Sequence, residues 1–464
     1  MSSSSQNAFG TAVVVGASIG GSSVAATLSP HFDKVIVVER DELPQEPAKR
    51  KGVPHSYQFH TLTVGGRLAL EEIFPGLTEE VHAGGAPKPI LVRDSRYASK
   101  AGWFPRVPTE HEMLAVTRRY LEWYIRGRAG KLGNVEFVEG TQALGLVVND
   151  GRVTGLKVQN LTTKENSVIE ADLVVDTSGR PSQAPQWLEE AGYEKPKETV
   201  INARWGYATT YVEVPEDWHP DWHSTYIGPT VTGEGTAATR GGAMWRQEGN
   251  RYVITAQGCA GDFPPQDLEG FKEYISSFGF TDFIDMINQF GTVEPVEAWR
   301  NTSNRLRDFA GMPDRPEGFV VVGDACAAFN PIYGQGMSMA AFAAQRLGNA
   351  VGARKAAGKG LDDGFTADFQ RGYQEFLAPF WEFSTSSDYG IPGVEVDGVA
   401  VEVRDRPESQ YADRLLALAT EDADVAVKFM ETVSMLRDTS WMAEESLRER
   451  VQADWDRLGS LSRD

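Results

Sequence analysis

The stretch 320–338, VVVGDACAAFNPIYGQGMS, decides the fold of this 464-residue chain. An apolar run ends at Gly323-Asp324, and a loop with two further glycines leads into a small-residue helix predicted to begin near Met337. The Asp324 carboxylate can accept hydrogen bonds from a sugar-alcohol chain, and glycines let backbone N–H groups approach a flat ring. The helix N-terminus adds positive potential. The pattern therefore predicts a flavin site, with an ordinary strand-turn-helix as the alternative.

A second glycine-rich turn lies about 300 residues earlier, between two apolar runs. Residues 11–15 precede Gly16-Ala-Ser-Ile-Gly-Gly21, a helix is predicted over 22–28, and the run 35–38 ends at Glu39. This is the order of a dinucleotide-binding unit, in which the acid binds ribose hydroxyls. An acid favours a free 2′-hydroxyl, so the turn indicates FAD or NAD rather than NADP. The two motifs together predict one FAD that runs from its adenine at the first to its ring at the second.

The predicted fold class is α/β: a Rossmann-like FAD-binding domain, an inserted β-sheet substrate domain and a helical C-terminal region. A strand-rich, aromatic stretch interrupts the cofactor motifs, which makes the FAD-binding domain discontinuous. The predicted boundaries are 8–80, 108–194 and 300–360 for the FAD-binding domain, 81–107 and 195–299 for the substrate domain, and 361–464 for the helical region.

Local patterns predict the individual elements. Helical spacing runs through 110–130 and 268–278, and Asn149-Asp-Gly151 predicts a hairpin turn. A polar connection is expected over 390–407 within the helical region. Strands are expected over 135–138, 143–148, 153–159, 172–176, 207–214, 241–245 and 251–256.

Composition narrows the class of partner. The net charge of −20 argues against nucleic acid or an anionic membrane surface. Two cysteines supply no disulfide framework, so a reducing, cytoplasmic location is expected. The serine-rich start, 1–7, is expected to be a disordered tail rather than a signal peptide, and no apolar run has the length of a membrane span. The scattered histidines form no metal-site spacing, so no metal is predicted.

The order of the motifs resembles a known family. The two glycine motifs, the helix with Arg118, the segment Asp176-Thr-Ser-Gly-Arg180, and Arg50-Lys-Gly-Val-Pro54 with a later His60 occur together. They resemble the single-component, aromatic-hydroxylase-type FAD monooxygenases. The closer likeness is to the bacterial polyether epoxidases of the monensin and lasalocid type, and a more distant one is to squalene epoxidase.

The resemblance implies roles for individual residues. The first turn would face the pyrophosphate, Glu39 the ribose, and Asp324 the ribityl chain, while Pro331, Gly334 and Gln335 would line the ring. No catalytic side chain is implied with certainty. The implied cofactor-binding residues are Gly16, Ser18, Ile19, Gly20, Gly21, Glu39, Arg40, Arg50, Val53, Arg118, Asp324, Gly334, Gly336, Met337 and Ser338.

Several residues keep a structural alternative. Arg118 could be a solvated helix arginine, Arg50 and Lys51 an exposed loop, and His60 a structural histidine rather than an acid or base. One position departs from the family: Ser178 stands where hydroxylases carry the aspartate of an Asp-Gly pair that serves FAD and NADPH. NAD(P)H could therefore act directly or through a separate flavin reductase. The signature of flavin halogenases is not matched by 242–246, which argues against halogenation.

The resemblance implies a flavin-dependent monooxygenase that inserts one oxygen atom from O2 into an apolar polyene or aromatic substrate through a C4a-hydroperoxyflavin. Alkene epoxidation in secondary metabolism is favoured, because attack by an alkene needs no side-chain base. Aromatic hydroxylation on the same fold, an isoprenoid reductase or desaturase, and a flavin-binding sensor are the alternatives.

Overall fold

The two glycine-rich motifs meet on one parallel sheet in the computed structural model, which describes residues 9–229, 239–402 and 407–461. The predicted tail, 1–7, lies outside the described residues. All four strand pairings are parallel, and the apolar runs of the central strands are buried, as in a sheet covered on both faces. The strand order is β17 (Phe319–Val321), β9 (Leu173–Asp176), β1 (Phe9–Val15), β2 (Phe32–Val38) and β5 (Val135–Val138).

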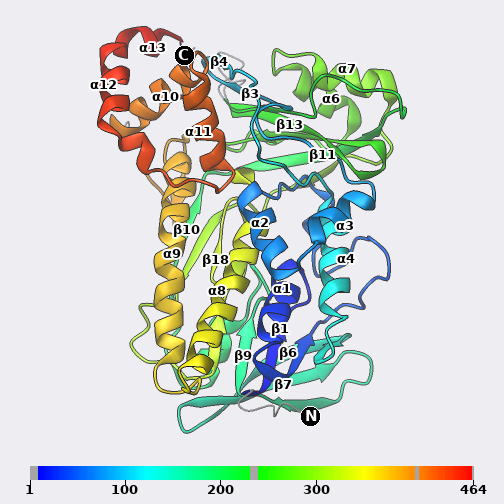
Figure 1. Ribbon diagram of the computed structural model, residues 1–464, viewed down its shortest axis with the longest axis vertical. Coiled ribbons are helices and arrows are strands. Elements are labelled where there is room, and N and C mark those ends of the chain that lie inside the picture. The colour runs from blue at the N-terminus through cyan, green and yellow to red at the C-terminus, as the bar shows by residue number, and fades with distance from the viewer. Residues whose placement is uncertain (1–8, 230–238, 403–406, 462–464) are drawn as a thin grey trace.

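Helices and a small antiparallel sheet complete this part of the molecule (Figure 1). Helix α1 (Ile19–Leu28) packs against α8 (Gly336–Ala356) and α4 (Arg118–Ala129), with α2 (Val64–Ile73) and α3 (Leu77–Ala83) alongside. Small side chains make this approach possible, since a Cβ placed on Gly20 would lie 3.5 Å from the Ala340 Cβ. Strands β6 (Thr141–Asn149), β7 (Arg152–Asn160) and β8 (Asn166–Glu170) contribute apolar side chains to the same core.

A second, seven-stranded sheet lies above the first (Figure 1). Helices α6 (Leu268–Ser276) and α7 (Asp282–Phe290) pack on one face of it. Side chains alternate along its strands, so Ala208 faces these helices while Tyr207 points to the other side, toward the cofactor motifs. Its order is β15 (Glu297–Trp299), β11 (Gly206–Glu213), β14 (Arg251–Gly258), β13 (Arg240–Gln247), β12 (Ser224–Ile227), β3 (Ser95–Ser99) and β4 (Gly102–Trp103).

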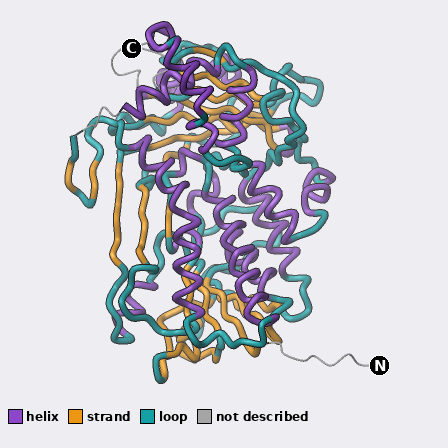
Figure 2. Tube along the Cα trace, turned by 60° about the vertical axis from the view of Figure 1, so that its left-hand side comes forward, coloured by secondary structure: helices purple, strands orange, loops and turns teal. Residues whose placement is uncertain are grey.

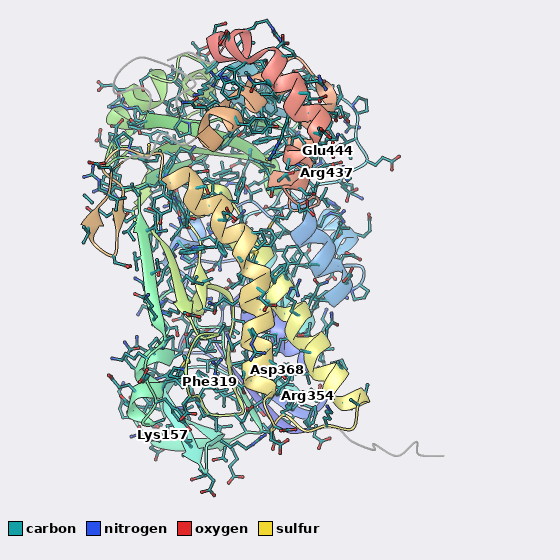
Figure 3. All side chains as sticks on the ribbon, turned by 90° about the vertical axis from the view of Figure 1, so that its left-hand side faces the viewer. Lys157, Phe319, Arg354, Asp368, Arg437 and Glu444 are labelled. Carbon is teal, nitrogen blue, oxygen red and sulfur yellow. The ribbon has the colours of Figure 1, made fainter. Side chains whose placement is uncertain are left out.

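A third sheet runs between the two others along one side of the molecule (Figure 2). Its order is β18 (Ala327–Ala328), β16 (Asn304–Asp308), β10 (Lys197–Asn202), β19 (Glu395–Val396) and β20 (Val399–Ala400). The long helix α9 (Phe365–Asp388) lies beside α8, and Asp368 contacts Arg354 at 3.4 Å (Figure 3).

The last helices form a cluster beside the seven-stranded sheet. They are α10 (Pro407–Ala419), α11 (Ala423–Val433), α12 (Glu445–Ala453) and α13 (Trp455–Leu461). They bury apolar side chains against Val64, Leu91 and Met113. Within the described ranges, no helix combines the length and the apolar character that a membrane crossing needs.

The predicted fold class is confirmed, and one local prediction is wrong in part. The helix expected over 110–130 begins only at Arg118, because Thr117 caps it by accepting from Tyr120 N. Residues 113–116 belong to no helix or strand, and all four are buried, so their apolar side chains resembled the buried face of a helix. The connection expected over 390–407 contains the hairpin β19–β20, turned at Asp397-Gly398 with positive φ at both residues. The predicted turn at Asn149-Asp-Gly151 is confirmed.

Candidate cofactor site

The two motifs line one elongated site. A cavity of about 540 Å³ lies between the start of α1, the 3₁₀ turn Gly323–Ala325 and the start of α8. A smaller cavity of about 130 Å³ adjoins it beyond the first turn, lined by Gly16, Glu39 and Gln142. The two share lining residues, among them Ser18, Arg40 and Ser178, so they form one continuous path.

At the narrow end, Glu39 both fixes the turn and lines the cavity. Its Oε2 accepts from Ala17 N at 2.8 Å and contacts Arg50 Nη1 at 3.1 Å, while Oε1 accepts from Asp41 N at 3.1 Å. The acid at the end of β2 is therefore held at the mouth of the glycine turn, where ribose hydroxyls would lie.

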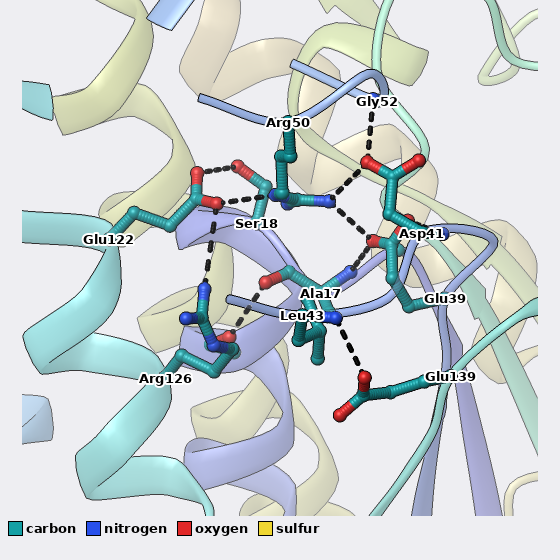
Figure 4. Close-up of polar contacts among 12 residues, drawn as sticks. Ala17, Ser18, Glu39, Asp41, Leu43, Arg50, Gly52, Glu122, Arg126 and Glu139 are labelled. Carbon is teal, nitrogen blue, oxygen red and sulfur yellow. Dashed lines mark hydrogen bonds and ion pairs between the residues drawn. The ribbon is translucent and has the colours of Figure 1, made fainter. Parts of the chain in front are cut away.

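A buried ionic network joins the turn to α4 (Figure 4). Glu122 accepts from Arg50 Nε at 2.8 Å, from Arg118 Nη1 at 3.1 Å and from Ser18 Oγ at 2.8 Å, and Arg118 Nη2 donates to Ser18 Oγ at 2.9 Å. The side chains of Arg118 and Arg50 are buried, so Arg118 is not a solvated helix arginine and Arg50 does not belong to an exposed loop. Lys51 is exposed, as the alternative for that residue expected. The Arg50 Nη2 is buried and has no partner among the described residues. This donor and the Ser18 hydroxyl lie where the pyrophosphate of a dinucleotide would run.

At the wide end, Asp324 lies opposite two arginines. Burial raises the pKa of Asp324, and the positive charges of Arg180 and Arg118 oppose that shift. A Cβ placed on Gly323 or Gly336 would meet nothing within 4 Å, so both backbones face open space. Gly334 has φ of 68°, which closes the turn before α8. An acid that accepts from hydroxyls and a backbone open to a flat group fit the ribityl chain and ring of a flavin.

Most of the predicted residues line this path, and three do not. Gly21 packs directly against the backbone of Gly16 instead. The Ser338 hydroxyl is 2.8 Å from the Thr63 hydroxyl, and Gln335 is buried away from the cavity. Ser338 therefore joins α8 to Thr63 rather than lining the path, and Gln335 precedes the first residue of α8 outside the cavity. The predicted residues that line the two cavities are Gly16, Ser18, Ile19, Gly20, Glu39, Arg40, Arg50, Val53, Arg118, Asp324, Pro331, Gly334, Gly336 and Met337.

The cavity also contains residues that sequence reasoning missed. His55 lies in the turn Pro54–Tyr57, with its ring 5.5 Å from the rings of His60 and Trp299. Burial and Arg118 lower the pKa of His60 to about 3 and hold that of His55 well below its usual value, so both are neutral at pH 7. His60 Nδ1 lies 2.8 Å from the Gln58 carbonyl, to which only an N–H can donate, so Nε2 is left as an acceptor.

Further residues reach the cavity through long-range contacts. Tyr207 and Trp299 pair across β11 and β15, and both line the cavity. Arg180 lines it and donates to the carbonyls of Ser303 at 2.8 Å and Phe329 at 2.6 Å. Arg180 belongs to a segment quoted in the sequence, but local patterns carry no signal for Tyr207.

The charge of the cavity is opposite to that of the molecule. The chain carries a net charge of −20, yet the larger cavity is lined by Arg40, Lys51, Arg118, Arg180 and Arg305 against Asp324. A cationic path in an acidic protein favours a small anion over other partners. The path, its unpaired donor and its open glycines fit FAD.

Comparison with a family model points to the same cofactor, and three curated proteins are similar in sequence. A family model described as "FAD binding domain" matches residues 70–270. The chain is 29% identical to Protein Rv3254 of Mycobacterium tuberculosis over 446 residues, which is 92% of this chain and 89% of that protein. It is 22% identical to a digeranylgeranylglycerophospholipid reductase of Thermoplasma volcanium, over 56% of this chain and 57% of that one. It is 24% identical to squalene epoxidase 4 of Arabidopsis thaliana, over 71% of this chain and 59% of that one.

Solved structures share the whole architecture. The p-nitrophenol 4-monooxygenase PnpA of Pseudomonas putida superposes with a TM-score of 0.63 at 15% identity, covering 94% of this chain and all of that one. The flavin-dependent brominase Bmp2 superposes with a TM-score of 0.60 at 14% identity, covering 96% and 98%. The chain therefore contains a Rossmann-type FAD-binding domain and has the fold of FAD-dependent monooxygenases and halogenases.

Proposed function

We propose that the protein is an FAD-dependent monooxygenase that transfers one oxygen atom from O2 to an apolar organic substrate, with epoxidation of an alkene as its reaction. The observation that carries the proposal is the continuous cationic path between Glu39 and Asp324, whose wide end is also lined by the aromatic side chains of Phe59, Tyr207 and Trp299. Bound FAD, once reduced, would supply the oxygen chemistry.

The residues of the chain bind, orient and exclude water. Arg50 and Ser18 would hold the phosphates, and Asp324 would accept from the ribityl hydroxyls. Phe59, Tyr207 and Trp299 lie where a substrate would meet the ring, and they supply apolar walls. Such walls keep water from the reacting atoms, which favours transfer of oxygen over its loss as peroxide.

The protonation states at the wide end favour epoxidation over hydroxylation. Hydroxylation of a phenol gains from a base whose pKa lies near the working pH. His60 is neutral and accepts at Nε2, but with a pKa of about 3 it is a weak base. Attack by an alkene needs no such base, so the wide end suits an alkene better.

The test of the proposal is incorporation of ¹⁸O from ¹⁸O2. The FAD-loaded protein, a reductant and a panel of terpenoid and polyene alkenes should give epoxides that carry one ¹⁸O atom. Phenols tested in parallel should give less product. A saturated product formed without oxygen would instead support a double-bond reductase, the second candidate, which the reductase relative favours. Absence of FAD from the purified protein, with no uptake on addition, would contradict the proposal as a whole.

Replacement of Asp324 by asparagine should weaken FAD binding without unfolding the chain. A carboxylate that accepts from hydroxyls contributes about 1.5–3 kcal/mol, so the Kd should rise by about 10- to 150-fold. Glu39→Ala should act similarly at the ribose end. Both Kd values can be measured by titration of flavin fluorescence. Wild-type affinity in both variants would show that the cofactor lies elsewhere.

The electron donor is expected to be a separate flavin reductase. Ser178 lines both cavities, so a hydroxyl rather than a carboxylate stands at this position. NADPH alone should reduce the bound flavin more slowly than turnover with an added reductase. Stopped-flow reduction measures both rates, and Ser178→Asp is the matched variant, expected to raise the rate with NADPH. Reduction of the wild type by NADPH as fast as turnover would refute this prediction.

A further inference from the structure

One buried carboxylate holds the loop that lines the wide end of the cavity. Asp388, the last residue of α9, is fully buried and lies behind the loop 330–334. Its Oδ1 accepts from Tyr333 OH at 2.9 Å and from Asn330 Nδ2 at 3.2 Å, and Oδ2 lies 3.3 Å from the same Asn330 nitrogen. Two side chains of the loop are therefore bound to one acid from a different part of the chain.

The same carboxylate also binds the framework around the loop. Oδ1 accepts from Trp205 Nε1 at 2.9 Å, and Oδ2 accepts from Asn304 Nδ2 at 2.7 Å. Asn304 in turn accepts from Asn330 N at 2.7 Å, which fixes the start of the loop again. Asp388 thus joins α9, the strand β16 and the residue before β11 to the loop.

The orientation of this loop decides which atoms face the cavity. Pro331 and Gly334 line the cavity, whereas Tyr333 points away from it toward Asp388 and Phe383. The hydrogen bond of Tyr333 therefore sets the rotation of the turn that presents Gly334 to a flavin ring. Loss of that bond would free the turn without removing any group that touches the cofactor.

The carboxylate is unusual in its charge environment. No ion pair among the described residues joins Asp388 to a cation. Burial raises the pKa of Asp388 to about 6, although its donors from Tyr333, Trp205, Asn330 and Asn304 act to lower it. The other titratable groups that it influences are Tyr333 and Cys259, whose pKa values are raised, so both stay neutral between pH 5 and 8.

We propose that Asp388 is a positioning residue for the loop 330–334, and that the loop is held in its cofactor-binding conformation only while this carboxylate is ionised. This inference rests on the proposed FAD site. A proton on Asp388 occupies one of the lone pairs that the four donors need, so one donor loses its acceptor below about pH 6. The loop then rotates more freely, and the cavity holds a flavin ring less well.

The experiment compares FAD affinity at about pH 7.5 and about pH 5. Loss of one charged acceptor corresponds to about tenfold in affinity, so the wild-type Kd should rise by about tenfold at the lower pH. Asp388→Asn should bind about tenfold more weakly already at the higher pH, with little further change. Asp368→Asn is the control, because it removes the same charge from an exposed position of α9 and should follow the wild type.

A cofactor-free measurement separates this inference from the proposed function. In protein labelled with fluorotryptophan, the ¹⁹F signal of Trp205, assigned from Trp205→Phe, should titrate with a midpoint near pH 6 in the wild type and not in Asp388→Asn. Failure of the wild type to bind FAD would overturn the proposed function alone.

A second variant is available if Asp388→Asn does not fold. Tyr333→Phe keeps the carboxylate and should weaken FAD binding by about threefold. An unshifted Trp205 signal, a wild-type pH profile in Asp388→Asn, or wild-type FAD affinity in Tyr333→Phe would overturn the role of Asp388.

Discussion

Replacement of Gly21 by alanine should destabilise the protein by about 3 kcal/mol even in the absence of FAD. An added Cβ would lie 1.7 Å from the Gly16 carbonyl oxygen and 2.8 Å from Thr177 Oγ1. Neither neighbour can move easily, because one is backbone and the other donates to the Val15 carbonyl at 2.7 Å. The turn that joins β1 to α1 would have to open. Urea unfolding of the FAD-free variant measures the loss.

Gly20→Ala is the matched control for this prediction. The nearest atom to a Cβ at Gly20 is the Ala340 Cβ at 3.5 Å, an ordinary contact. Alanine is favoured over glycine within a helix by up to about 1 kcal/mol, so the FAD-free variant should be at least as stable as the wild type. Because Gly20 lines the cavity, the FAD affinity of the Gly20→Ala protein should nevertheless be lower than that of the wild type. Equal stability of the two variants would contradict the account of the turn.

Replacement of Glu122 by leucine should cost about 3–5 kcal/mol of folding free energy. The Glu122 carboxylate is buried and is bonded to Arg118 and Arg50, so its loss leaves two buried cations without their main acceptor. Glu136→Gln is the control, since it breaks an exposed ion pair with Lys34 and should cost less than about 1 kcal/mol. Denaturant unfolding of both variants gives the comparison, and similar losses would show that the buried network contributes little.

The Glu122 contribution should depend on pH in a defined direction. Burial acts to raise the pKa of Glu122, but Arg118, Arg50 and the Ser18 hydroxyl outweigh it and hold the pKa below the usual value of 4.5. An acid whose folded-state pKa is lowered stabilises the fold fully above its unfolded pKa. The difference in stability between wild type and Glu122→Leu should therefore be constant above about pH 5 and shrink as the pH falls below 4.5.

Short-range signals were sufficient for the cofactor motifs. Each depends on neighbours within about 20 residues: an apolar run, glycines at a turn, and an acid at the end of the next strand. The same kind of signal was insufficient for residues 113–116, where four consecutive buried apolar residues outside any helix resembled the spacing of a helix. It also missed the Asp397-Gly398 turn, because the strands β19 and β20 that flank it have two residues each.

The amino-acid sequence was enough to predict the α/β class, the two glycine-rich turns and the acids beside them, Glu39 and Asp324, because these depend on local backbone geometry. Only the folded chain places Glu122 in ion pairs with Arg50, Arg118 and Arg126, and brings His55 beside Trp299. It also decided that Asp388 holds a loop more than 50 residues away in the chain. These contacts join segments whose local sequences hold no information about each other. Burial, charge pairing and the pKa of a side chain depend on which residues the folded chain places beside it.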